Sequence, residues 1–241
     1  MKRYAPIAAA FLILLAPQAA LAQSLNLDLG DGPSSTGRLI QLFLLFTVLS
    51  LAPSILVMVT CFTRIVVVLS FLRTAMGTQQ TPPNQVLMSL ALFLTLFIMM
   101  PTLQESWDQG IQPYIVGQID ETQAFERSSA PLRVFMLKHV RDADLQLFAD
   151  AAKVDTAATT EVPLRVLIPA FMISELRRSF EIGFLVFIPF LVIDMVVASV
   201  LMSMGMMMLP PVMIAMPFKI IFFVLVDGWF LIVGSLIQSF G

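Results

Sequence analysis

Four ionisable side chains lie within or at the edge of apolar runs, where an unpaired charge is costly. They are Arg64, Asp194, Lys219 and Asp227. Arginine is effectively always charged, so Arg64 is expected to face protein, water or a carboxylate. Asp194 and Asp227 are expected to pair with Arg64 or Lys219, or to accept backbone and hydroxyl donors. A second interpretation of Arg64, a side chain that snorkels to a membrane edge, stays equally open.

The same residue types suit a proton relay. A proton-coupled secondary transporter that uses Arg64, Asp194 and Asp227 is therefore the alternative function. Many transporters are built from internal repeats, however, and the apolar hairpin that holds both aspartates has no repeat elsewhere in this chain.

Catalytic and metal chemistry has few candidate residues. The chain contains a single cysteine, Cys61, and a single histidine, His139, which removes most metal sites and thiol–imidazole catalysis. The nucleophile motif Gly-x-Ser-x-Gly does not occur, and His139 lies far along the chain from any carboxylate in an apolar run. An intramembrane hydrolase is thus the weaker of the two alternatives, and the residues suggest no cofactor or metal.

Methionines gather near the C-terminal end, between two long apolar runs. Eight of the 16 methionines fall between Met195 and Met216. Three of them, Met206, Met207 and Met208, stand in the short segment that joins the two runs. Methionine is unbranched, flexible and polarizable. From composition alone this segment is equally a packing elbow and a pliable functional loop.

Composition places these residues in a membrane context. Hydrophobic residues make up 58% of the chain and charged residues 12%, and the mean hydropathy is +0.90. Such values are typical of an integral membrane protein or a membrane-embedded assembly protein. The net charge of −2 gives no reason to expect nucleic acid as a partner.

The N-terminal residues have the pattern of an export signal. Residues 1–22 combine a basic start, an apolar centre and the small-x-small sequence Ala20-Leu21-Ala22, which predicts a cleaved signal peptide. An uncleaved first membrane helix is the alternative. Residues 23–37 are polar and turn-rich and are expected to be a flexible leader. Cleavage would place the new N-terminus outside the cytoplasmic membrane of a bacterium.

Two apolar helical hairpins are predicted, at 38–101 and at 183–241. The run 39–72 is too long for one membrane span of about 20 residues and short for two, and Pro53 interrupts it. The run 86–100 is below spanning length, so it either continues past Pro101 or is buried against other protein. These awkward lengths indicate that partner helices cover much of the apolar surface.

A polar helical insertion, residues 102–182, separates the hairpins. Its first part is expected to be irregular with short helices, and Ser128–Pro131 reads as a helix start with a second start near Asp144. Phe135 and Phe148 are either the core of this small domain or side chains that reach a neighbouring subunit. Farther along, Glu175 and Arg178 have the i,i+3 spacing of a pair on the polar face of a helix.

Several motifs resemble those of the FliP family of flagellar export-gate proteins, which is related to the injectisome family SctR. The resemblance runs from about residue 40 to the end and includes the signal peptide, which injectisome members as a rule lack. The matching segments are Phe62–Ile65 (FTRI), Gly77–Gln79 (GTQ), Pro82–Val86 (PPNQV), Pro169–Phe184 (PAFMISELRRSFEIGF), Phe187–Asp194 (FIPFLVID), Gly205–Pro211 (GMMMLPP), Pro217–Lys219 (PFK) and Phe223–Trp229 (FVLVDGW).

The resemblance implies a protein that is not an enzyme: an all-α, membrane-associated subunit of a helical, multi-subunit gate of the type III secretion apparatus. In such a gate about five copies assemble with FliR and FliQ, with FlhB attached and FlhA nearby, and unfolded flagellar proteins pass through. It implies a location in the inner membrane at the flagellar basal body, with the insertion and the N-terminus periplasmic. Met206, Met207 and Met208 match the family's constricting loop, and Phe135, Phe148, Glu175 and Arg178 are the candidates for contacts between subunits.

Overall fold

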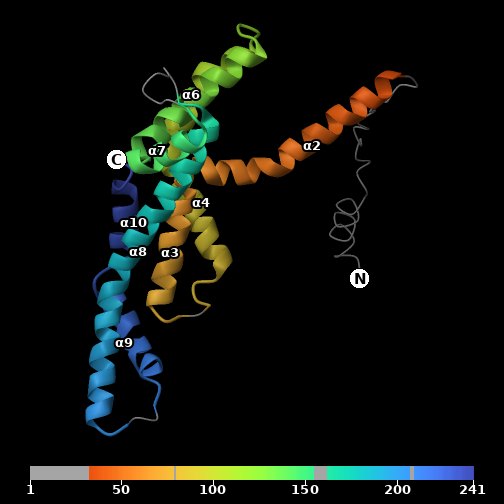
Figure 1. The fold of residues 1–241 in the computed structure, drawn as a ribbon. Coiled ribbons are helices and arrows are strands. Elements are labelled where there is room, and N and C mark those ends of the chain that lie inside the picture. Colours follow the sequence, from red (N-terminus) through yellow and green to blue (C-terminus); the bar gives the residue numbers. More distant parts are fainter. Residues whose placement is uncertain (1–32, 79, 155–161, 207–208) are drawn as a thin grey trace, which may run out of the picture. The chain divides into compact units, whose positions relative to one another are not determined.

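The structure is a computed structural model that describes residues 33–78, 80–154, 162–206 and 209–241 (Figure 1). Every regular element within these ranges is helical, which confirms the expected all-α fold. The predicted signal peptide, residues 1–22, and the leader up to residue 32 lie outside the described residues. The elements are α2 (Pro33–Val59), α3 (Phe62–Ala75), α4 (Asn84–Ser106), the π-helix η1 (Trp107–Ile111), α5 (Gln112–Ile115), α6 (Glu121–His139), α7 (Asp142–Ala151), α8 (Leu164–Ser203), α9 (Pro211–Leu225) and α10 (Gly228–Gln238).

The chain divides into two units, Met1–Ser50 and Leu51–Gly241. The described part of the first unit is the beginning of α2, which starts at Pro33, inside the segment expected to be a leader. Apolar side chains within residues 43–50 are exposed, with Phe43 at 72% and Phe46 at 65%. A helical stretch that exposes large apolar side chains within its own unit is suited to lipid or to another protein surface.

The second unit has its core around α3. Side chains at i, i+3, i+4 and i+7 of this helix are buried, namely Ile65, Val68, Leu69 and Leu72. Leu87, Ala91 and Leu94 of α4 and Leu236 of α10 pack against part of this set. On another side, α3 packs along α8 (Figure 1). Because α3 is enclosed on several sides, the charged residue in its first turn is shielded from solvent.

The helix α4 extends beyond the apolar run 86–100 that the sequence suggested as its length. It passes through Pro101 to Ser106 and continues through η1 and α5, so that helical structure extends over Asn84–Ile115. The π-helix brings Gly110 against α6, where a Cβ added to Gly110 would lie 2.6 Å from the backbone nitrogen of Ser128. Of the two readings, continuation past the proline is the one observed.

The expected helix start at Ser128–Pro131 is wrong. The helix α6 begins at Glu121, where the Asp120 side chain accepts a hydrogen bond from the Gln123 backbone N–H at 2.7 Å. This N-cap satisfies a free donor of the first turn and decides where the helix begins. Pro131 lies inside α6 instead. The next helix, α7, starts at Asp142, close to the expected restart.

The helix α8 is continuous over 40 residues and crosses the expected boundary between insertion and C-terminal hairpin at 182/183. The second arm of that hairpin is broken into α9 and α10, which meet at an angle of 64°. Asp227 stands at the break with φ 52°, and a Cβ at the following Gly228 would lie 2.1 Å from the Phe223 ring. Glycine therefore permits this close turn.

Several helices have the length and composition of membrane spans. Among the described residues, two qualify singly, Asn84–Ile115 and Leu164–Ser203. The number rises to four if each bent pair, α9 with α10 and the two parts of α2, is one span. The fold is that of a membrane-associated, all-helical protein.

Candidate functional site

The first candidate feature is a buried ion pair between α3 and α8. Arg64, in the first turn of α3, donates from Nε to Glu175 Oε2 at 2.8 Å and from Nη2 to Glu175 Oε1. Arg64 is 1% exposed and Glu175 is 0% exposed. Two parallel N–H···O bonds to a carboxylate are the strongest geometry available to arginine.

The rest of the guanidinium is held by the C-terminal residues. Arg64 Nη1 donates to the backbone oxygen and to the hydroxyl of Ser239, both at 3.0 Å. The Phe240 ring lies over the guanidinium, 3.7 Å from ring centroid to Cζ. Arg64 therefore fastens three distant segments together, namely α3, α8 and the residues after α10, and it does not snorkel to an edge.

A second, partly buried ion pair joins α8 to α9. Lys219 Nζ donates to Asp194 Oδ2 at 2.6 Å and to the backbone oxygen of Ala75, at the end of α3, at 3.0 Å. The Lys219 side chain is 3% exposed and that of Asp194 is 29% exposed. Asp194 Oδ1 is buried and accepts no hydrogen bond from any described residue.

The ionisable candidates are thus divided between two separate clusters, and they do not form one chain. Arg64 pairs with Glu175, whereas Asp194 pairs with Lys219. Asp227 is exposed at the break between α9 and α10, and its side chain does not cap α10. A relay through Arg64, Asp194 and Asp227 has no support in this arrangement.

Among the expected subunit contacts, Phe135 and Glu175 are used within the subunit. Phe135 is half-buried, with ring centroids 5.9 Å from Phe171 and 6.2 Å from Phe240. Glu175 does not pair with Arg178 on a polar face, because it turns inward to Arg64. Arg178 is exposed and Phe148 is half-buried on α7.

Only the first residue of the methionine triplet belongs to the described residues. Met206 is 43% exposed, and its backbone N–H donates to the oxygen of Leu201 at 3.0 Å. It follows Gly205, whose φ of +73° turns the chain out of α8. Met207 and Met208 lie outside the described residues. The visible part of the segment therefore presents a methionine to solvent at the end of α8.

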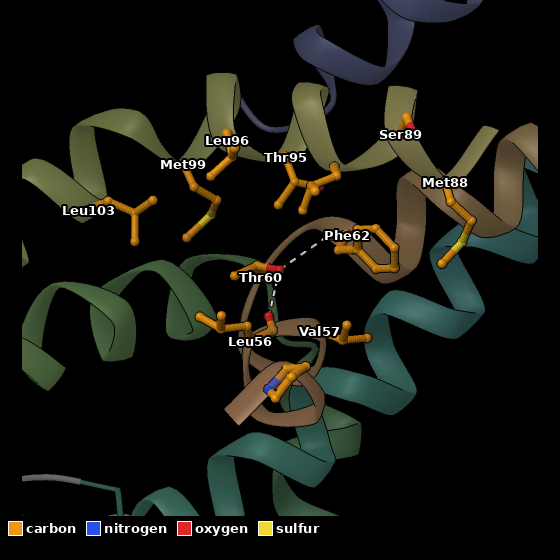
Figure 2. A pocket seen from close by; sticks show the side chains of 12 residues that line it. Leu56, Val57, Thr60, Phe62, Met88, Ser89, Thr95, Leu96, Met99 and Leu103 are labelled. Atoms are coloured by element: carbon orange, nitrogen blue, oxygen red, sulfur yellow. Dashed lines mark hydrogen bonds between the residues drawn. The ribbon is translucent and has the colours of Figure 1, made fainter. Parts of the chain in front are cut away.

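An apolar groove of about 370 Å³ lies between the end of α2, the start of α3 and α4 (Figure 2). Thr60 stands at the break between α2 and α3. Its hydroxyl donates to the oxygen of Leu56 at 2.8 Å and accepts from the Phe62 N–H at 3.4 Å. These bonds satisfy backbone groups at the break. The groove itself is lined almost wholly by carbon and sulfur atoms, including those of Met88 and Met99.

His139 is the last residue of α6 and lies close to Phe240, whose ring covers the Arg64 guanidinium. Its Nδ1 lies 2.8 Å from the Phe135 backbone oxygen, and its ring lies 5.3 Å from that of Phe240. Burial lowers the pKa of His139 below its usual 6.5, which favours the neutral ring. Cys61 is buried. Within the ranges that the structure describes, no group of three or more histidine, cysteine or acidic side chains could hold a metal ion.

The role of Glu175, Ser239 and Phe240 around Arg64 was missed by sequence reasoning. One signal was available for Glu175. It shares a helical face with Phe171, Ser174 and Ser179, and all four are buried. No comparable signal marks Ser239 or Phe240, because their contact with Arg64 depends on how α10 returns to α3.

Fold and site define a class: a membrane-associated helical protein in which two ion pairs join apolar helices to one another. The comparisons with known proteins then give the family. The FliP family model matches residues 45–236, and the chain belongs to that family. It is 60% identical to the flagellar biosynthetic protein FliP of Caulobacter vibrioides, over 97% of this chain and 89% of the relative. It is 55% identical to the protein of the same name from Bacillus subtilis, over 90% of this chain and 98% of the relative.

Proposed function

We propose that this chain is a non-enzymatic subunit of the flagellar protein export gate and helps to form the channel for unfolded flagellar proteins. The observation that carries the proposal is family membership over most of the chain, with relatives named as flagellar biosynthetic proteins. The apolar helices agree with a place in the bacterial inner membrane at the flagellar basal body. The predicted signal peptide favours a periplasmic insertion and N-terminus.

Within this gate, we assign the constriction to Met206, Met207 and Met208. An export channel must admit chains of many sequences and still exclude ions and small molecules when it is idle. Thioether side chains exclude water but have flexible torsions, so a ring of them can deform around varied cargo. The exposure of Met206 at the end of α8 supports this assignment.

The two ion pairs are suited to positioning that loop. Lys219 and Asp194 connect the two helices that flank the loop, and Lys219 also reaches the end of α3. Arg64 and Glu175 connect α3 to the same long helix. Two helices that are cross-linked in this way would hold the segment between them at a defined place.

The proposed assembly is a ring of about five copies with FliR and FliQ, and with FlhB and FlhA nearby. Support comes from the exposed apolar surface of the chain. Phe93 of α4, Phe184 of α8 and Leu225 of α9 are 68%, 67% and 80% exposed. Such extensive apolar surface is covered by lipid or by other subunits. Phe148 and Arg178, which are accessible in the subunit, remain proposed contacts to neighbours.

Deletion and complementation test the proposal. Cells that lack the chain should be non-motile and should not secrete flagellar proteins, and the intact chain should restore both. Affinity purification through this subunit should recover FliR and FliQ. Restored secretion without any association with these proteins would contradict the gate assignment. Proton-dependent transport by the isolated subunit would favour the transporter alternative instead.

A further inference from the structure

A second, polar cavity of about 190 Å³ lies where the insertion meets the long helix α8. It is distinct from the methionine segment and from the Lys219 pair. Four cationic side chains and one acidic side chain line it, together with His139: Arg64, Lys138, Arg141, Arg178 and Glu181. The excess of positive charge in a partly enclosed space is suited to an anion.

The acidic groups near this cavity have other partners. Glu175 is occupied by Arg64, and Glu181 accepts from Arg177 Nε at 3.0 Å. Asp144 accepts from the Ser174 hydroxyl at 2.7 Å. Arg64 and Arg141 each have a carboxylate partner among these acids, whereas Lys138 and Arg178 form no ion pair with a described residue.

Arg141 gives the most direct sign of a missing ligand. Its Nη1 is buried and has no hydrogen-bond partner among the described residues, while the side chain as a whole is 40% exposed. The nearest carboxylate oxygen, Asp144 Oδ2, is 3.8 Å away, which is beyond hydrogen-bond distance. A buried N–H group without an acceptor is unfavourable, and an anion in the cavity would supply an acceptor for Nη1.

The surface next to the cavity continues it as an apolar stripe. Ser174, Arg178 and Glu181 line the cavity at i, i+4 and i+7 of α8. The same helical face continues at i+11, i+14 and i+18 with Leu185, Ile188 and Val192, which are 65%, 41% and 50% exposed. From Glu181 to Val192 the helix rises about 16 Å, close to the roughly 15 Å of hydrocarbon in one leaflet.

We propose that this cavity binds the phosphate group of an anionic phospholipid, with an acyl chain along the exposed stripe of α8. Arginine binds phosphate oxygens through its forked donors, so Arg141 and Arg178 would hold the phosphate and Lys138 would add a third cationic contact. Arg178 would then contact lipid in place of a neighbouring subunit. Basic pockets between membrane helices bind anionic headgroups in other proteins. Because α8 is about 60 Å long, twice the thickness of a bilayer core, one end projects beyond the hydrocarbon, and the cavity marks where the apolar stripe begins.

Lipid titration of the purified full-length chain tests the proposal by native mass spectrometry in a mild detergent. Phosphatidylglycerol should bind at least tenfold more tightly than phosphatidylcholine. The double variant Arg141→Gln with Arg178→Gln should weaken phosphatidylglycerol binding about tenfold for each arginine, or about 1.4 kcal/mol each. Arg127→Gln, an exposed residue of α6 outside the cavity, is the charge-matched control and should bind as the native chain does.

Two further binding measurements, one with lipid and one with inorganic phosphate, distinguish a lipid headgroup from a free anion. Leu185→Asn should weaken binding of phosphatidylglycerol and leave binding of inorganic phosphate unchanged. Each variant must be folded, which is checked by comparing its far-UV circular dichroism spectrum and its unfolding midpoint with those of the native chain. If the double variant does not fold, Arg178→Lys is used instead; it keeps the charge and should retain much of the affinity.

Three results would overturn the proposal. The first is an affinity for phosphatidylglycerol that changes less than twofold in the folded arginine variants. The second is inorganic phosphate binding as tightly as the lipid with no effect of Leu185→Asn, which would indicate a free-anion site. The third is a map of the assembled complex in which a carboxylate of a neighbouring subunit fills the cavity.

Discussion

The ion pair between Arg64 and Glu175 leads to the sharpest prediction about stability. In Glu175→Gln the side chain keeps its shape but loses its charge, and Arg64 keeps a charge that is 1% exposed. One amide oxygen can still accept from the guanidinium, whereas the amide N–H₂ faces other donors. Ser239 and Phe240 continue to hold the remaining side of the arginine.

The expected loss follows from these contacts. At least one charge-assisted hydrogen bond disappears, worth about 1.5–3 kcal/mol, and an uncompensated buried charge remains. Breaking a buried pair from one side typically costs about 3–5 kcal/mol. Because Arg64 keeps its contacts to Ser239 and Phe240, we expect about 3 kcal/mol, or more than a hundredfold in the ratio of folded to unfolded protein.

The assay is equilibrium unfolding of the detergent-solubilised chain by increasing mole fractions of sodium dodecyl sulfate, followed by tryptophan fluorescence. Glu181→Gln is the matched control, because Glu181 is 50% exposed in its side chain and pairs with Arg177 on the surface of the same helix. Exposed pairs contribute at most about 1 kcal/mol, so the control should stay close to the native chain.

A double variant separates the charge from the packing. Arg64→Met with Glu175→Met removes both charges and keeps apolar volume, and it should recover most of the stability lost in Glu175→Gln. Two results would refute the reasoning: a loss below about 0.5 kcal/mol in Glu175→Gln, or equal losses in Glu175→Gln and the control Glu181→Gln.

Three further predictions follow from particular contacts. Lys219→Met should reduce the free energy of unfolding by about 2 kcal/mol in the same assay, less than Glu175→Gln, because water reaches the partly exposed Asp194; no loss would contradict the pairing. Burial lowers the pKa of His139 from its usual 6.5, so its stabilising contribution is complete above pH 6.5 and is lost as pH falls through the lowered value. Unfolding between pH 5 and 8 should therefore depend less on pH in His139→Gln than in the native chain, and parallel profiles would argue against this. Gly110→Ala should cost about 1–3 kcal/mol, because the new Cβ meets the backbone of Ser128, and an unchanged unfolding midpoint would contradict the close approach of η1 to α6.

Composition and periodicity were sufficient to predict the all-helical fold. The apolar runs correspond to α2, α3, α4, α8, α9 and α10, and their awkward lengths correspond to bends that the sequence does not specify. Proline illustrates the difficulty. Pro101 and Pro131 each suggested a boundary, yet both lie inside helices, because tertiary packing offsets the local cost of one missing hydrogen bond.

The partners of buried charges could not be predicted from local spacing. Glu175 has Arg178 within reach along the helix, but Arg64, which is 111 positions away, is the partner that burial selects. A carboxylate that is shielded from solvent, such as that of Glu175, needs a partner with several hydrogen-bond donors in fixed directions. Arg64 on the enclosed helix α3 provides these donors. Asp194 and Lys219 were both identified as ionisable residues in apolar runs. Their ion pair forms because α9 packs back along α8, which the sequence does not specify.

The most direct test of the account concerns the methionine segment. In cells that contain an assembled gate, methionines 206–208 would be replaced with alanine, and the uptake of a small, normally impermeant dye would be measured. Alanine at Met100, Met202 and Met213, which are 57%, 61% and 64% exposed, is the matched control. The account predicts raised dye uptake in the 206–208 variant and native uptake in the control. Unchanged permeability in 206–208 variant cells, with the complex recovered intact with FliR and FliQ, would contradict the central claim that this segment seals the channel.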